Sequence, residues 1–302
     1  MQALESCKTL HDGVLSYIKL ENVTHFDPVK TFDCGQCFRF ERVESSRHES
    51  EFAGVAFGRL ISVAKDGNNL YIYNTDEREY NGIWRRFLGL DVDYEAVAAD
   101  ILSRSDNPAL AAAVELGSGI RILRQESWET VCSFIISQNN NIPRIKKIIS
   151  NLCARLGEPV YAPGMESHGG AEGYSFPDAA IVAAAGAGLL AELKTGFRAK
   201  YIADAAEKFS SGRLDLDFLE SCPDTALCAE MLKSVKGIGD KVAACALLFG
   251  FGRLDAFPVD VWIKRVIAKY FGEGFDKAAL GPYAGVAQQY LFYYERWLGG
   301  QS

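Results

Sequence analysis

The chain has 302 residues, of which 48% are hydrophobic, and its formal net charge is −7. This length is enough for two domains with sizeable cores. No apolar run reaches the roughly 20 residues of a membrane span, and the N-terminus lacks the pattern of a signal peptide. We therefore expect a soluble intracellular protein that contacts no membrane, in the cytoplasm or nucleoid if it is prokaryotic.

Cysteine and histidine usage argues against a metal centre. The eight cysteines have irregular spacing, which indicates buried or free thiols in a reducing compartment. Cys34 and Cys37 have the spacing of half a metal site, but two further ligands are not obvious. The four histidines, at positions 11, 25, 48 and 168, form no cluster in the sequence. We expect no metal site and no mechanism based on histidine.

Residues 34–74 are typical of short strands. The runs 38–43, 51–63 and 70–73 are rich in Phe, Tyr, Val and Ile, and Asp66-Gly67-Asn68 is a turn signal between the last two. This pattern predicts an antiparallel sheet. Helical spacing begins near Ile83, a Gly- and Pro-rich loop is predicted at 157–176, and helices resume from Asp178 to Leu298.

The predicted fold class is therefore α+β. An N-terminal antiparallel sheet domain with flanking helices is expected at residues 1–118. An all-helical domain that contains a helix–hairpin–helix motif is expected at residues 119–302.

The charge is unevenly distributed along the chain. Residues 1–120 carry 12 basic and 19 acidic side chains, whereas residues 121–302 carry 20 of each. Within the second part, residues 231–270 carry seven basic and three acidic side chains. Such a local basic segment is able to bind DNA on a neutral domain, although a solvated helix face explains the same charges.

A tight turn, Gly237-Ile238-Gly239, separates two apolar helical segments. It leaves backbone N–H groups free at the start of the second helix, where the helix dipole also favours an anion. The pattern predicts a phosphate-binding hairpin. Lys241 lies in the first turn of the second helix, where it serves either as a phosphate contact or as a nucleophile.

Asp260 follows Lys241 by 19 residues, within Pro258-Val259-Asp260. Pro258 disfavours helix before it, so Asp260 is a natural N-cap for the helical segment that follows. A carboxylate there is also able to stabilise a sugar cation. The sequence alone leaves the cap and the catalytic role open.

Four motifs follow one another along the chain in the same order as in a known family. These are the hairpin with Lys241 and Pro258-Val259-Asp260, residues 121–125 with 132–144, residues 32–39 and residues 285–292. In them, the chain resembles the 8-oxoguanine DNA glycosylase/AP lyases of the helix–hairpin–helix (HhH-GPD) superfamily. The resemblance runs from about residue 20 to residue 298.

The resemblance implies a base-excision repair enzyme, a bifunctional DNA glycosylase and class I AP lyase. Its partner would be double-stranded DNA containing 8-oxoguanine opposite cytosine. No metal or organic cofactor is expected, because a lysine supplies the nucleophile, and a monomer is the default expectation. Lys241 would attack C1′ and form a Schiff base, and Asp260 would stabilise charge on the sugar. The other implied roles are contacts with DNA. The damaged base would be bound by Gly35, Cys245, Gln288 and Phe292. The opposite base and the gap left in the duplex would be contacted by Asn139, Arg144, Phe197 and Arg198, and the phosphates by Gly237, Gly239, Val242 and Trp262.

The chain departs from the family pattern at a few of these positions. Phe197 stands where the best-known members have a tyrosine wedge, and Trp262 replaces a histidine. Glu295 replaces an aspartate, and Cys34 and Cys37 replace two serines around the recognition glycine.

Other functions remain open on the sequence alone. A noncatalytic helix–hairpin–helix module needs only the glycines and basic residues, so the pairing of Lys241 with Asp260 argues against it. A monofunctional glycosylase for another damaged base would keep Asp260 and generally lack the lysine. The branch with an iron–sulfur cluster is excluded, because no cysteine follows Cys245.

Overall fold

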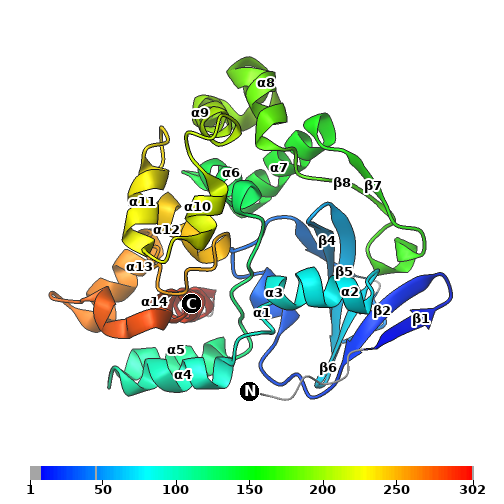
Figure 1. The fold of residues 1–302 in the computed structure, drawn as a ribbon. Coiled ribbons are helices and arrows are strands. Elements are labelled where there is room, and N and C mark those ends of the chain that lie inside the picture. Colours follow the sequence, from blue (N-terminus) through cyan, green and yellow to red (C-terminus); the bar gives the residue numbers. More distant parts are fainter. Residues whose placement is uncertain (1–7, 45, 301–302) are drawn as a thin grey trace.

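The fold is described from a computed structural model, which covers residues 8–44 and 46–300. A sheet and a helical body lie side by side, and a thin arm, β7 and β8, reaches from the helices over the sheet (Figure 1). The predicted α+β class, with an antiparallel sheet followed by helices, is confirmed.

The N-terminal sheet has six antiparallel strands in the order β1-β2-β6-β5-β4-β3. The strands are β1 (Thr9–Asp12), β2 (Leu15–Leu20), β3 (Phe40–Arg42), β4 (Ser50–Ala56), β5 (Arg59–Asp66) and β6 (Asn69–Tyr73). The predicted run 51–63 is two strands, because Phe57 and Gly58 both have positive φ and form a turn. The first two strands were missed, although Asp12-Gly13 before an alternating run is a hairpin signal.

Short helices cover the inner face of the sheet: α1 (Pro28–Phe32), α2 (Glu77–Glu79), the π-helix η1 (Tyr80–Trp84) and α3 (Arg85–Phe87). Aromatic rings fill this interface, as in the stacking of Phe32 on Phe40 with ring centroids 4.6 Å apart. The next helices, α4 (Tyr94–Ser103) and α5 (Pro108–Gly117), pack differently. Their buried side chains belong to the core of the helical body, although the expected first domain includes them.

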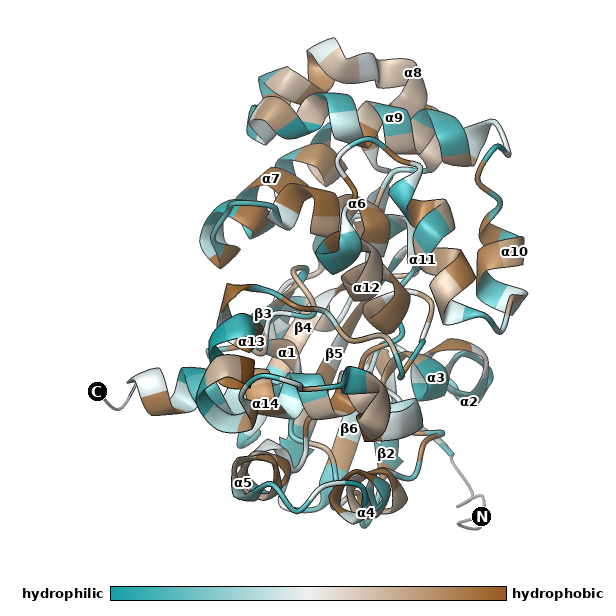
Figure 2. Ribbon diagram, turned by 90° about the vertical axis from the view of Figure 1, so that its left-hand side faces the viewer, coloured by the Kyte–Doolittle hydropathy of each residue, from teal (hydrophilic) through white to brown (hydrophobic). Residues whose placement is uncertain are grey.

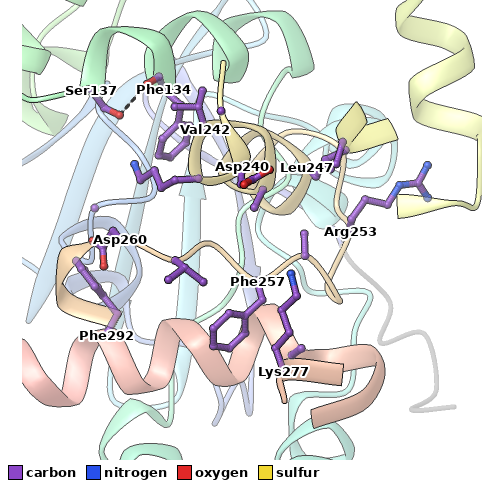
Figure 3. A pocket seen from close by; sticks show the side chains of 18 of the residues that line it. Phe134, Ser137, Asp240, Val242, Leu247, Arg253, Phe257, Asp260, Lys277 and Phe292 are labelled. Carbon is purple, nitrogen blue, oxygen red and sulfur yellow. Dashed lines mark hydrogen bonds between the residues drawn. The ribbon is translucent and has the colours of Figure 1, made fainter. Parts of the chain in front are cut away.

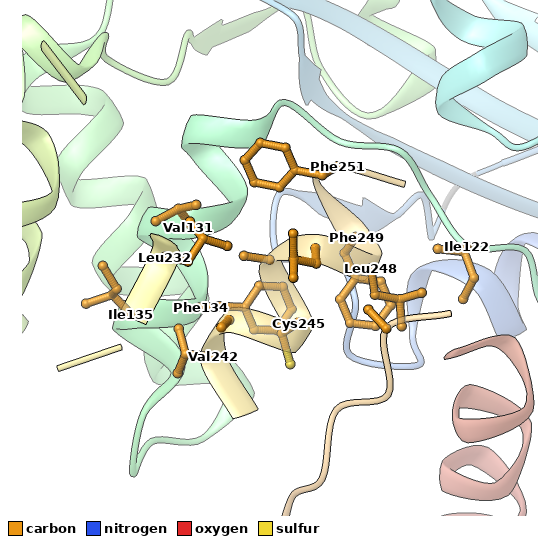
Figure 4. Close-up of a cluster of buried hydrophobic side chains, with 14 of the residues drawn as sticks. Ile122, Val131, Phe134, Ile135, Leu232, Val242, Cys245, Leu248, Phe249 and Phe251 are labelled. Carbon is orange, nitrogen blue, oxygen red and sulfur yellow. The ribbon is translucent and has the colours of Figure 1, made fainter. Parts of the chain in front are cut away.

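The helical body is built around α6 and α12, which pack against each other. Its elements are α6 (Ser127–Ser137), α7 (Ile142–Leu156), α8 (Ala179–Leu190), η3 (Ala191–Thr195), η4 (Gly196–Arg198), α9 (Ala199–Ser210), α10 (Leu216–Ser221), α11 (Thr225–Lys233), α12 (Asp240–Phe249), α13 (Val261–Val266), η5 (Ile267–Phe271), η6 (Lys277–Tyr283) and α14 (Ala284–Gly300). Phe134 of α6 stacks on Phe249 of α12, beside Cys245 (Figure 4). This core fixes the start of α12 relative to α6.

The predicted loop 157–176 is partly regular. It contains β7 (Pro159–Tyr161), the 3-10 helix η2 (Met165–His168) and β8 (Glu172–Tyr174). His168 Nδ1 donates a hydrogen bond to the Glu51 carboxylate at 2.7 Å, and its ring stacks on Tyr73, with ring centroids 4.0 Å apart. His48 contacts the Tyr73 hydroxyl at 2.8 Å. Two histidines that lie far apart in the sequence therefore meet on one tyrosine of the sheet, a grouping that their spacing does not predict.

The expectation that no apolar run is long enough to span a membrane is wrong by length and composition. Residues 179–210 are long and apolar enough by composition, and α8 is apolar along most of its length (Figure 2). The run is not one straight helix, because Gly186, Lys194 and Gly196 have positive φ. It folds into α8 and α9, which pack against each other, and each is 12 residues long. Neither helix alone has the roughly 20 residues of a span.

Candidate functional site

A large open groove with a volume of about 2010 Å³ runs between α6, α12, α13 and α14 (Figure 3). Pockets for small molecules are usually about 300–1,000 Å³, so this groove is large enough for part of a macromolecule. We call its side formed by the starts of α12 and α13 the catalytic wall. We call its side formed by residues 34–36 and α14 the reading wall.

The hairpin before α12 presents unused backbone donors. Among the described residues, the N–H groups of Gly237, Gly239 and Val242 donate no hydrogen bond. Gly237 has φ +83 and its Cα lies against the Tyr201 ring, so a side chain there would be both strained and blocked. Asp204 of α9 accepts the neighbouring Lys236 N–H at 2.9 Å and steadies the turn. The start of α12 is thus arranged for an anion.

Lys241 lies in the first turn of α12 and points into the groove. Its Nζ lies 5.2 Å from the centre of the Phe134 ring. Burial raises the pKa of the Cys245 thiol one turn later, and the nearby Lys241 ammonium opposes that rise. The Lys241 side chain therefore lies between the Phe134 ring and the protonated Cys245 thiol, and it lines the groove.

Asp260 is the N-cap of α13 and also lines the groove. Its Oδ1 accepts the Ile263 N–H at 2.8 Å. Its Oδ2 accepts no hydrogen bond from the described residues. The carboxylate therefore uses one oxygen to cap α13 and keeps the other available, so the cap does not prevent a catalytic role.

Gly35 lines the groove from the reading wall. Its φ of +84 lies in the left-handed region, although a Cβ there would meet no atom within 4 Å. Side chains are therefore disfavoured by backbone strain and not by lack of space. Its carbonyl accepts no hydrogen bond among the described residues.

The other predicted base contacts lie at different depths. Phe292 of α14 lines the groove, and the Arg296 guanidinium lies over its ring at 5.6 Å. Cys245 and Gln288 are buried, with 3% and 4% of their surface exposed, and lie behind the groove surface. Gln288 Oε1 is a buried oxygen with no hydrogen-bond partner, which is the expected state of an acceptor that a ligand completes.

The predicted opposite-base residues form a second cluster, at the junction of α6 and α7. Asn139 has φ +47 and an exposed side chain, and Arg144 is also exposed. Arg198 is buried, and its guanidinium donates to the carbonyls of Gln138, Asn139 and Thr195. A direct contact between Arg198 and a base requires these bonds to be exchanged. Phe197, by contrast, is 49% exposed, as a wedge must be.

Two departures from the family pattern have local partners of their own. Trp262 lines the groove with 39% of its surface exposed, and the Arg265 guanidinium lies 5.3 Å from its ring centre. Glu295 accepts hydrogen bonds from Tyr270 Oη at 3.0 Å and from Lys269 Nζ at 3.3 Å. Glu295 therefore forms hydrogen bonds with two residues of η5.

Nothing in the described part of the chain groups three potential metal ligands. Burial raises the pKa of the Cys34 thiol to about 12 and that of the Cys37 thiol to about 11. Both cysteines therefore stay protonated and pack as small apolar groups.

Two further side chains, not predicted from the sequence, support the predicted site residues. The ring of Phe134 lies against the Lys241 amine, and the Arg296 guanidinium lies over the Phe292 ring. Arg296 follows Phe292 by four residues, which places it on the same helix face, so its spacing was an available signal. Phe134 gave no such signal, because its contact with Lys241 depends on how α6 and α12 pack.

Two family models match adjacent parts of the chain. Residues 19–131 match the model described as "8-oxoguanine DNA glycosylase, N-terminal domain". Residues 132–278 match the model described as "HhH-GPD superfamily base excision DNA repair protein".

Solved structures resemble the whole chain. A structure described as MBOgg1 in complex with a low affinity DNA ligand is 36% identical, covers 98% of this chain and all of its own, and has a TM-score of 0.86. The 8-oxoguanine glycosylase/lyase of Clostridium acetobutylicum, in complex with DNA containing cytosine opposite 8-oxoG, is 34% identical. It covers 98% of this chain and 99% of its own, with a TM-score of 0.85.

A curated relative matches a smaller share. The N-glycosylase/DNA lyase of Saccharomyces cerevisiae is 35% identical over 192 residues, or 60% of this chain. The matched region spans about half, 49%, of the yeast protein's length.

Proposed function

Because the chain belongs to the 8-oxoguanine DNA glycosylase family of the HhH-GPD superfamily, we propose that it excises 8-oxoguanine from duplex DNA and nicks the resulting abasic site. The observation that carries this function is the catalytic wall. Lys241 Nζ and the free Oδ2 of Asp260 line one groove, next to unused N–H donors of the hairpin.

The chemistry follows from these positions. The hairpin amides bind the DNA backbone phosphate, and the damaged base leaves the stack because its glycosidic bond is otherwise inaccessible. The Lys241 amine attacks C1′, the glycosidic bond breaks, and the base leaves with the bonding electrons and takes up a proton. Asp260 Oδ2 stabilises the positive charge that develops on the sugar.

The lyase step uses the same lysine. Opening of the sugar converts the aminal into a Schiff base between Lys241 and C1′. Loss of a proton from C2′ then expels the 3′ phosphate by β-elimination, and water releases the lysine. Nothing in these steps calls for a group beyond Lys241, Asp260 and solvent.

Recognition is assigned to the reading wall. The Gly35 carbonyl accepts the N7 hydrogen, which 8-oxoguanine has and guanine lacks. Gln288 binds the Watson–Crick edge, with its unpartnered Oε1 as the acceptor. Cys245 and Phe292 enclose the base, and Trp262 lies beside the sugar–phosphate backbone.

The second cluster engages the strand that carries the opposite base. Phe197 fills the gap left by the flipped base, since an exposed aromatic ring is able to insert between base steps. Asn139 and Arg144 contact a cytosine, and Arg198 holds the Asn139 backbone from behind. The enzyme acts as a monomer on duplex DNA with 8-oxoguanine opposite cytosine.

Borohydride trapping tests the proposal. A labelled duplex with one 8-oxoguanine opposite cytosine should give a covalent protein–DNA band that undamaged duplex does not give. Lys241→Gln should abolish this band, a loss of at least about 1,000-fold, while duplex binding is kept. Lys236→Gln is the matched control, because this hairpin lysine is 75% exposed and should still allow trapping. A band from Lys241→Gln would contradict the assignment.

A further inference from the structure

The carbonyls on either side of Gly35 are both occupied, in contrast to its own. Gln289 Nε2 of α14 donates to the Cys34 carbonyl at 3.0 Å. Gln125 Nε2, from the segment before α6, donates to the Gln36 carbonyl at 2.7 Å. Of these three consecutive carbonyls, only that of Gly35, a residue that lines the groove, accepts no hydrogen bond among the described residues.

Gln36 anchors the same loop from below. Its side chain is completely buried and accepts the Leu123 N–H at 2.9 Å. Its amide donates to the carbonyls of Thr31 and Arg121 at 2.9 and 2.8 Å. The loop is thus tied to the interdomain segment 121–125 without any help from α14, so Gln289 is an additional link of a different kind.

Gln289 is the link between the loop and α14. Its neighbour Gln288 and the stacking ring of Phe292 lie on the same helix, and Gln289 itself is 97% buried. Because one base must touch Gly35, Gln288 and Phe292 together, the spacing between the loop and α14 sets how well it fits. Displacements of about 1 Å are enough to weaken such recognition.

We propose that Gln289 is a specificity-determining positioning residue, which sets the Gly35 carbonyl at the distance from α14 that 8-oxoguanine requires. The proposal rests on the proposed function. Gln289 itself touches no DNA, and it acts through the Cys34 carbonyl. A purely structural role would affect all DNA ligands equally, whereas a positioning role affects only ligands that carry the base.

The test measures dissociation constants of Lys241→Gln protein, which does not turn over, with and without Gln289→Met. Three duplexes are compared, with 8-oxoguanine, guanine or a tetrahydrofuran abasic analogue opposite cytosine. Methionine keeps the length of the side chain and removes the donor. We expect 8-oxoguanine affinity to fall about 5-fold, which corresponds to one buried hydrogen bond, while affinity for the tetrahydrofuran duplex stays within about 2-fold.

Leu291→Val is the matched control, since Leu291 is a fully buried residue of α14 in the helical core. It should lower stability without changing the ratio of the affinities for 8-oxoguanine and tetrahydrofuran. If Gln289→Met does not fold, Gln289→Asn, which retains the amide but is too short, replaces it. An unchanged ratio in the Gln289 variant, or an equal loss for all duplexes, overturns the inference. A parent protein that does not prefer 8-oxoguanine to guanine overturns the proposed function as well.

Discussion

The catalytic wall and the reading wall of the groove are held in place in different ways. On the catalytic wall, the starts of two helices position the side chains that are proposed to react with the sugar. Asp260 is fixed by the cap that it makes itself, and Lys241 by the core contact of α12 with α6. On the reading wall, the group proposed to recognise the base is the backbone carbonyl of Gly35. Glutamine amides from distant parts of the chain bind the carbonyls on either side of it.

This difference predicts that chemistry and discrimination are separately adjustable in this protein. A change on the catalytic wall should affect every substrate that has a sugar to attack. A change on the reading wall should affect only substrates that still carry the base.

After Lys241→Gln, the largest expected effect comes from Asp260→Asn on the catalytic wall. Asparagine caps helices as well as aspartate, so the free energy of unfolding should change by only a few tenths of a kcal/mol. Loss of the negative charge should lower the single-turnover excision rate about 100-fold or more. The measurement is gel analysis of excision, with denaturant unfolding alongside.

Asp215→Asn serves as its control, because Asp215 is the N-cap of α10 and lies outside the groove lining. This variant should be unaffected in rate. If the two variants lose activity equally, the separate electrostatic role of Asp260 is wrong.

A smaller effect is expected at Asp204, which supports the hairpin of the catalytic wall. Burial acts to raise the pKa of this carboxyl, but the Lys236 N–H together with Lys208 and Lys236 holds it below its ordinary value of 3.8. A lowered pKa means that the ionised form favours the fold. Its contribution is therefore complete above about pH 4 to 5 and is lost as the pH falls through the lower value in the fold.

The corresponding measurement is urea unfolding of wild type and Asp204→Asn at several pH values. The variant should be less stable by about 1 kcal/mol at pH 7, and this difference should shrink as the pH falls below the ordinary value of 3.8. A stability difference that is the same at pH 7 and pH 3 would show that the charge of Asp204 does not matter.

Much of the catalytic wall could be predicted from the sequence, because its residues lie in local patterns. A glycine turn before a helix and an aspartate two residues after a proline are both recognisable from a few neighbouring residues. The support of the reading wall could not be predicted, because Gln289 and Cys34 are 255 residues apart and no periodicity connects them. The same holds for the burial of Arg198 beneath the Asn139 loop and for the two histidines on Tyr73.

The most direct test of the two-wall account is borohydride trapping of Gly35→Ala on two duplexes, one with 8-oxoguanine and one with a preformed abasic site. Alanine is strained at φ +84 and shifts the carbonyl, whereas the catalytic wall is untouched. The account predicts trapping that is strongly reduced on 8-oxoguanine and near wild type on the abasic site, while Lys241→Gln loses both. Equal loss of trapping by Gly35→Ala on the two duplexes would contradict it.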